Sequence, residues 1–137
     1  MTGKIDHQTA LIYTMVLASA ADADMTDAEL LQIGDMVRHL PVFAGFDQEE
    51  LPAVAAGCAE ILGRDGGLDE VIGMIRDALP EKLRETAYAL ACEVTAADRV
   101  IAQEELRLLE LLRHGLQVPR LSAAAIERAA SARYASA

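Results

Sequence analysis

The chain has 137 residues, of which 53% are hydrophobic, and its 22 acidic residues against 12 Lys and Arg give a formal net charge of -10. This length predicts one domain with a sizeable core. The charge argues against nucleic-acid binding, which needs a basic surface, and against binding to anionic membranes. Cations and basic protein surfaces are compatible with it.

Apolar residues recur at helical spacing over residues 6–21 and predict a first helix. A second helix is predicted from Asp27, because Thr26 suits the N-cap position and Glu29 stands three residues later, as in a capping box. Pro41 should end this helix. Its apolar residues predict a buried stripe of Leu30, Ile33, Val37 and Leu40.

Five further helices are predicted beyond a short turn. The run FDQEE at residues 46–50 repeats the capping-box pattern and should open a third helix that ends near residue 63. Gly115 suits a C-cap, and Ser122 is predicted to cap the last helix, which fades out towards the C-terminus. The remaining helices are predicted at residues 68–79, 80–97, 103–114 and 122–137. No run of alternating β-branched residues predicts a strand.

One stretch occurs twice in the chain. Residues 20–30 read AADADMTDAEL and residues 96–106 read AADRVIAQEEL, at a constant offset. Each copy joins the end of an apolar helix to the start of an amphipathic one. We therefore predict an all-α bundle of about seven helices in a single domain, residues 1–137, with an internal pseudo-two-fold duplication. The first repeat covers about 6–63, a bridging helix about 67–79, and the second repeat about 80–135.

The repeated stretch places carboxylates where they could converge on a cation. Asp22 and Asp24 fall between two helices, and Glu29 falls in the first turn of the next helix, with its side chain directed back towards them. In the second copy, Asp98 and Glu105 occupy the positions of Asp22 and Glu29. Oxygen ligands favour calcium or magnesium, whereas zinc prefers His or Cys, which are absent from the motif.

Helix capping offers a second interpretation of the same residues. Glu29 could do no more than close the capping box on Thr26, and Asp22 could form an Asx-turn. The second copy has Ala102 where the first has Thr26, so capping explains Glu105 less well. Both interpretations stay open at the level of sequence.

The motif Ala-Ala-Asp-x-x-(apolar)-x-x-x-Glu-Leu, written twice between helices, resembles the TerB-like family of tellurite-resistance proteins. The resemblance covers about residues 5–130 and carries Asp22, Glu29, Asp98 and Glu105 as matching positions. It implies a compact duplicated helical fold with acidic residues that bind metal. It also implies a role in bacterial resistance to tellurite and other chemical stress, with a protein partner, for example in a membrane-associated resistance complex.

Three functions are compatible with these observations. The first is a non-enzymatic stress-response protein that binds a divalent cation through the acidic loops. The second is a metal-independent acidic interaction or scaffold module, and the third, ranked last, is an enzyme with paired carboxylates. No catalytic residues and no organic cofactor are predicted, and neither nucleic acid nor insertion into a membrane is expected.

The two cysteines, Cys58 and Cys92, lie among apolar helix formers and are predicted to be buried, unreactive thiols. Two cysteines do not form a disulfide framework, and this usage fits a reducing cytoplasm. The apolar N-terminal stretch is interrupted by Thr and Ser and follows Asp6 and His7, which argues against a signal peptide. We therefore expect a cytoplasmic location.

Overall fold

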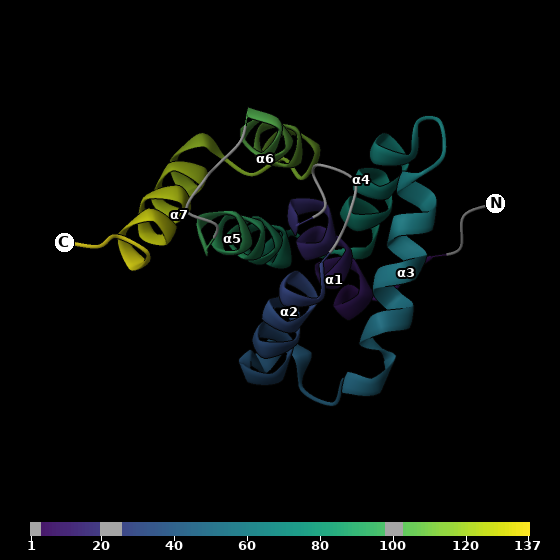
Figure 1. Ribbon diagram of the computed structural model, residues 1–137. Coiled ribbons are helices and arrows are strands. Elements are labelled where there is room, and N and C mark those ends of the chain that lie inside the picture. The colour runs from purple at the N-terminus through teal and green to yellow at the C-terminus, as the bar shows by residue number, and fades with distance from the viewer. Residues whose placement is uncertain (1–3, 20–25, 98–102) are drawn as a thin grey trace.

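The computed structural model describes residues 4–19, 26–97 and 103–137, and this part of the chain contains helices and no strand. The all-α prediction is therefore confirmed. Two short 3₁₀ turns, Pro41–Phe43 and Gln48–Glu50, accompany the α-helices. The α-helices, labelled in Figure 1, are α1 His7–Ser19, α2 Asp27–His39, α3 Leu51–Leu62, α4 Gly67–Ala78, α5 Glu81–Ala97, α6 Gln103–Gly115 and α7 Arg120–Arg133.

Helix α1 is the centre of the fold. Its residues from Ala10 to Ser19 are all buried, which follows from a sequence that is apolar on every side of the helix. The one hydroxyl in its middle, on Thr14, donates to the carbonyl of Ala10 at 2.8 Å. α1 packs most extensively on α5 and also contacts α2, α3, α4 and α6 (Figure 1). Neither α1 nor any other described helix is long and apolar enough to cross a membrane.

The outer helices are amphipathic and bury one stripe each. In α2 the predicted stripe is only partly buried, because Ile33 and Val37 are enclosed while Leu30 and Leu40 stay half-exposed. In α6, Leu108 and Leu112 are buried. Exposed positions of α2 and α6 therefore include apolar groups that the core does not use.

The start of α2 agrees with its sequence. The amide of Glu29 donates to Thr26 Oγ1 at 3.1 Å, and the amide of Thr26 donates to Glu29 Oε1 at 2.9 Å. Two amides that the helix itself leaves unpaired are thus satisfied by side chains. The predicted capping box is confirmed.

The start of the third helix differs from its prediction. Asp47 accepts the amide of Glu49 at 3.0 Å and opens a 3₁₀ turn, after which the α-helix begins at Leu51. Pro52 explains the delay, because a proline has no N–H to donate and is tolerated in the first turn of an α-helix, where no such donor is needed. The capping-box pattern at residues 46–50 therefore predicted the helix but placed its α-helical part several residues too early.

Two predictions at the C-terminal helices are wrong. Gly115 is the last residue of α6 and not its cap; Gln117 adopts the left-handed conformation, with φ 57°. A Cβ on Gly115 would collide with the side chain of Ile72, so close helix packing explains this glycine. Ser122 does not cap α7, since the helix already begins at Arg120 behind Pro119, whose fixed φ suits a helix start.

Helices α2 and α6 begin within the two copies of the acidic motif and have the same length, 13 residues. The pairing of the two repeats about a pseudo-two-fold axis stays a prediction, as does the division into repeats and a bridging helix. Helix α4, at the position of the predicted bridging helix, lies between α3 and α5 in chain order and packs against α1 and α3.

Candidate functional site

The structure describes two of the five predicted cation ligands. Glu29 and Glu105 lie in the first turns of α2 and α6 and are both half-buried. Asp22, Asp24 and Asp98 lie outside the described residues. The convergence of the five carboxylates is therefore untested.

Glu29 already has a structural role. Its Oε1 accepts the amide of Thr26, so one of its two carboxylate oxygens is engaged in capping. The other oxygen is the one that could turn to a cation without breaking the box. Within residues 4–19, 26–97 and 103–137, no three His, Cys, Asp or Glu side chains come close enough to hold a metal ion. A cation site at Glu29 would therefore require the aspartates of the preceding loop.

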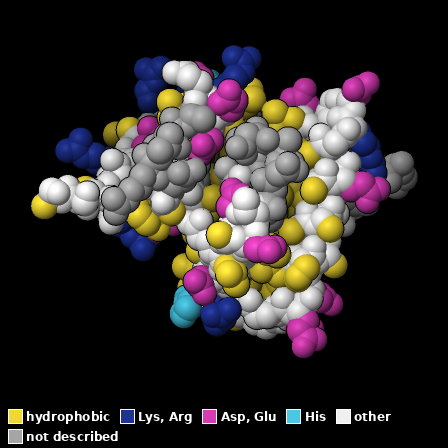
Figure 2. Space-filling view, in the orientation of Figure 1, with side chains coloured by type: hydrophobic (Ala, Val, Ile, Leu, Met, Phe, Trp, Pro, Cys, Tyr) yellow, Lys and Arg dark blue, Asp and Glu magenta, His cyan; other side chains and the backbone are white. Residues whose placement is uncertain are grey.

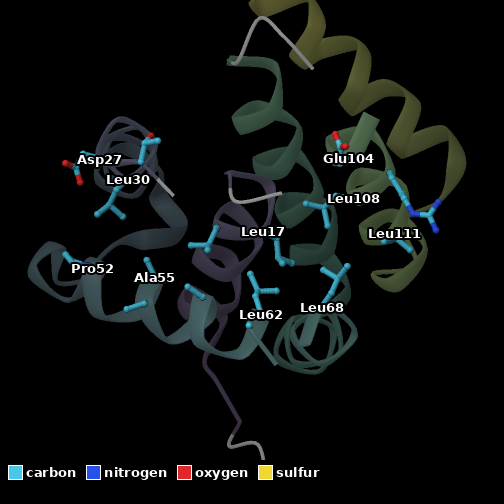
Figure 3. Close-up of a pocket in the computed structure, with 16 residues that line it drawn as sticks. Leu17, Asp27, Leu30, Pro52, Ala55, Leu62, Leu68, Glu104, Leu108 and Leu111 are labelled. Carbon is cyan, nitrogen blue, oxygen red and sulfur yellow. The ribbon is translucent and has the colours of Figure 1, made fainter. Parts of the chain in front are cut away.

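The first turns of α2 and α6 border a common groove. It has a volume of about 630 Å³ and lies over the C-terminal half of α1, between α2, α3, α4 and α6. Figure 3 shows Asp27 and Leu30 of α2 on one side, Glu104 and Leu108 of α6 on the other, and Leu17 of α1 between them. The starts of α2 and α6, which belong to the two copies of the acidic motif, thus border one hollow, which we call the α2–α6 groove.

The lining of the α2–α6 groove is mainly apolar. The side chains that make it so come from all five helices; they are Val16, Leu17, Leu30, Pro52, Ala55, Ala56, Ala59, Leu62, Leu68, Leu108 and Leu111. Figure 2 shows hydrophobic side chains gathered between α2 and α3, with acidic side chains over α2. Among the residues that the structure describes, the charged groups of the lining are Asp27, Glu104 and Arg107. None of these three forms an ion pair with another residue in the described part of the chain.

Asp27 and Glu104 were not among the predicted site residues. Their spacing to apolar residues was visible in the sequence: Asp27 stands three residues before Leu30, and Glu104 stands four residues before Leu108. Such spacing puts each pair on one helix face. However, only the tertiary arrangement brings these two faces to the same groove.

A second cavity, of about 540 Å³, lies between α5, α6 and α7. The hydroxyl of Tyr88 donates to Glu127 Oε2 at 2.5 Å at its edge. Burial, followed by this hydrogen bond, raises the pKa of Tyr88 far above its usual range. Thr95 also lines this cavity, and its buried hydroxyl makes no hydrogen bond to any residue that the structure describes. We call this second cavity the α5–α7 cavity.

Both cysteines are buried, as predicted. Cys58 is fully enclosed on the buried face of α3. Cys92 lines the α5–α7 cavity, with 4% of its surface exposed. Burial raises the pKa of each thiol to about 12. Neither thiol is therefore available as a thiolate near neutral pH.

The chain was also compared with known proteins. A family model described as tellurite resistance protein TerB matches residues 8–129. Searches of curated proteins and of solved structures found no match. Because the family model covers α1 to most of α7, including both helix starts at the α2–α6 groove, the chain belongs to the TerB family of tellurite resistance proteins.

Proposed function

We propose that this chain is a non-enzymatic stress-response protein of the tellurite-resistance type, which binds a divalent cation through its acidic inter-helix loops. Membership of the TerB family supports the link to chemical stress. The cation is proposed to be held by Asp22, Asp24 and Glu29, with Asp98 and Glu105 as the counterpart from the second copy of the motif. Carboxylate oxygens favour calcium or magnesium over zinc.

The observation that best supports this proposal is the α2–α6 groove. Thr26 and Asp27, which directly follow the first acidic loop, and Glu104, which follows the second, all line it. A divalent cation bound near these two helix starts would offset their negative charge. An ion bound by one loop or both would thereby influence the orientation of α2 and α6 at the groove.

Glu29 allows the cation role to be separated from the capping role. Gln is the other residue that closes a capping box, so Glu29→Gln should retain the cap while losing the negative charge. Wild-type protein with calcium at a hundredfold excess over its Kd should gain about 2.7 kcal/mol of unfolding free energy. In EDTA the Glu29→Gln variant should be within about 0.5 kcal/mol of wild type, the cost of losing a negative charge in the first turn of α2, and it should gain much less from calcium.

The measurement is urea unfolding followed by circular dichroism, in EDTA, in calcium and in magnesium. Asp22→Asn serves as a second variant, and Asp69→Asn, an exposed change in the first turn of α4, serves as the control. If neither calcium nor magnesium stabilises the wild-type protein, the cation proposal is wrong. If Glu29→Gln keeps the full calcium response, Glu29 is a capping residue only.

A second candidate function is a metal-independent interaction module that binds a basic protein surface. The apolar lining of the α2–α6 groove together with Asp27 and Glu104 favours it. Partner binding should then persist in EDTA and weaken as salt concentration rises, because exposed charges are screened. A membrane-associated resistance complex, as the family resemblance implies, is the proposed setting for such a partner.

A further inference from the structure

One side of α3 forms a wall of small residues in the α2–α6 groove. The side chains that face the core, at Leu51, Ala55, Cys58 and Ile61, are buried. Residues Pro52, Ala56, Ala59 and Gly63 line the groove and are exposed. From residue 52 to residue 63 this wall extends for about 16 Å, at 1.5 Å per residue.

The small size of the residues in this wall determines which secondary structure could pack against it. Helices pack at axial distances of 8–10 Å, and the distance depends on the side chains at the contact. Ala56, Ala59 and Gly63 would allow a guest helix to approach closely. A guest strand would find no partner, because the groove is bordered by helices whose backbone groups are already paired within each helix.

Leucines from four helices complete the groove. Leu30, Leu62 and Leu68 are half-buried, and Leu111 is 37% exposed to solvent. Apolar surface of this kind gains about 25 cal/mol for each Å² that a guest removes from water. Their positions around the small wall suit apolar side chains that repeat along one face of a helix.

The charged side chains at the sides of the groove indicate the sign of the charge that a guest helix should carry. Asp27 on α2 and Glu104 on α6 stand on opposite walls (Figure 3). Arg107 is the one cation of the lining among residues 4–19, 26–97 and 103–137, and the whole chain carries a formal charge of -10. The balance favours Lys or Arg along the flanks of the guest.

From this geometry we propose that the α2–α6 groove docks an amphipathic α-helix of a partner protein, with its apolar face against α3 and basic side chains towards Asp27 and Glu104. The proposal rests on the interaction role proposed above and does not need the cation. A second copy of this chain is a poorer guest. Its charge is of the same sign, and the apolar face of its most basic helix, α7, is already packed on α5.

The test uses a fluorescein-labelled helical peptide of about 18 residues, with Leu at i, i+3, i+4 and i+7 and Lys on both flanks. A second peptide has Glu in place of every Lys. Fluorescence anisotropy with the full-length protein in EDTA should show binding of the Lys peptide and none of the Glu peptide. Equal binding of both peptides, or no binding of the Lys peptide, would overturn the proposal.

A matched pair of substitutions on α3 separates docking from general charge attraction. Ala56 lines the groove, whereas Ala53 is exposed on the same helix outside it. Ala56→Gln should weaken the Lys peptide at least about tenfold, because its side chain fills the space for the guest backbone. Ala53→Gln should change the Kd less than about twofold. Both variants keep every charge and a good helix former, so equal effects would contradict docking at this wall.

The charge contribution is tested with the double variant Asp27→Asn and Glu104→Gln. It should weaken the Lys peptide about fivefold at low salt and flatten the dependence of Kd on salt. An unchanged salt dependence would remove the argument for a basic guest. Sedimentation of the protein alone measures its oligomeric state. If the protein is a dimer and Ala56→Gln dissociates that dimer, the groove binds a second copy of the chain and the proposal is overturned.

The failure of this proposal is distinguishable from failure of the cation proposal. Peptide binding is measured in EDTA, and calcium stabilisation is measured without peptide. Ala56→Gln should leave the calcium response intact, since Ala56 carries no cation ligand. Glu29→Gln should leave peptide binding in EDTA intact, since the cap at α2 is retained.

Discussion

The α2–α6 groove and the α5–α7 cavity are of similar volume but treat their charged groups differently. In the α5–α7 cavity, Glu127 accepts the hydroxyl of Tyr88 at 2.5 Å. Near it, Glu93 pairs with Arg133 at 2.6 Å and accepts the hydroxyl of Tyr134 at 3.3 Å. These two carboxylates are bonded to the protein's own side chains, whereas Glu110, which also lines the cavity, forms no ion pair in the described part of the chain.

The α2–α6 groove has carboxylates with no such partner. Asp27 and Glu104 form no ion pair with any residue among those the structure describes, although they border a larger apolar surface. A group paired within the protein contributes to folding, whereas an unpaired group at an apolar hollow is available to a ligand. The comparison makes the α2–α6 groove the better candidate for ligand binding and the α5–α7 cavity the better candidate for a structural role.

The test with the largest expected effect removes one side chain from each hollow. Tyr88 is 1% exposed, so Tyr88→Ala should lower the free energy of unfolding by about 3–5 kcal/mol. Leu111 is 37% exposed, so Leu111→Ala should lower it by only about 1 kcal/mol. Urea unfolding of both variants measures the difference. A loss at Leu111 that matches the loss at Tyr88 would mean that the groove, too, is part of the folded core.

A second test compares the two thiols by their response to pH. The folded pKa of Cys58 and of Cys92 is raised from 9.0 to about 12, so the folded state holds protons that the unfolded state has released between these values. The contribution of these two thiols to stability should therefore be constant below pH 9 and should fall as pH rises from 9 towards 12. At pH 10 each thiol should account for a loss of about 1 kcal/mol.

Single variants assign this loss to each site. Cys58→Ala and Cys92→Ala should each be less stable than wild type at pH 8, but each should lose less between pH 8 and pH 10. The two reductions should be similar, because burial is the main cause at both sites. If Cys92→Ala leaves the loss unchanged, Cys92 ionises near its ordinary pKa, and the α5–α7 cavity is open to water.

The sequence predicted the helices well because their signals are local. Apolar periodicity located the seven α-helices of the described residues, and the Thr26 and Glu29 pair located the start of α2. Two errors arose where a proline, Pro52 or Pro119, sets the helix start, and one arose where a distant contact decides. Gly115 suggested a cap, but its packing against Ile72 is set by the crossing of α4 and α6. No local pattern encodes that crossing.

The candidate site could be predicted only in part for the same reason. The duplicated motif directed attention to the starts of α2 and α6, and both do border the α2–α6 groove. The wall formed by α3 was missed, since an exposed Ala and Gly stripe looks like ordinary surface until other helices enclose it. The three aspartates that would complete a cation site lie outside the described residues, so that prediction stays open.

The smallest test uses the same substitution in both hollows. Glu127→Gln weakens the bond from Tyr88 by removing the charge of its acceptor, so it should lower the free energy of unfolding by about 1 kcal/mol. Glu104→Gln has no such bond to weaken and loses only a favourable position in the first turn of α6, which should cost about 0.5 kcal/mol.

Both Gln variants are compared with wild type by urea unfolding at pH 7, with and without the Lys peptide. In the absence of peptide, Glu127→Gln should be the less stable of the two. In its presence, Glu104→Gln should gain less stability than either wild type or Glu127→Gln, because it lacks a carboxylate that faces the guest. The reverse order in both measurements would exchange the roles of the two hollows, with the α5–α7 cavity as the binding site.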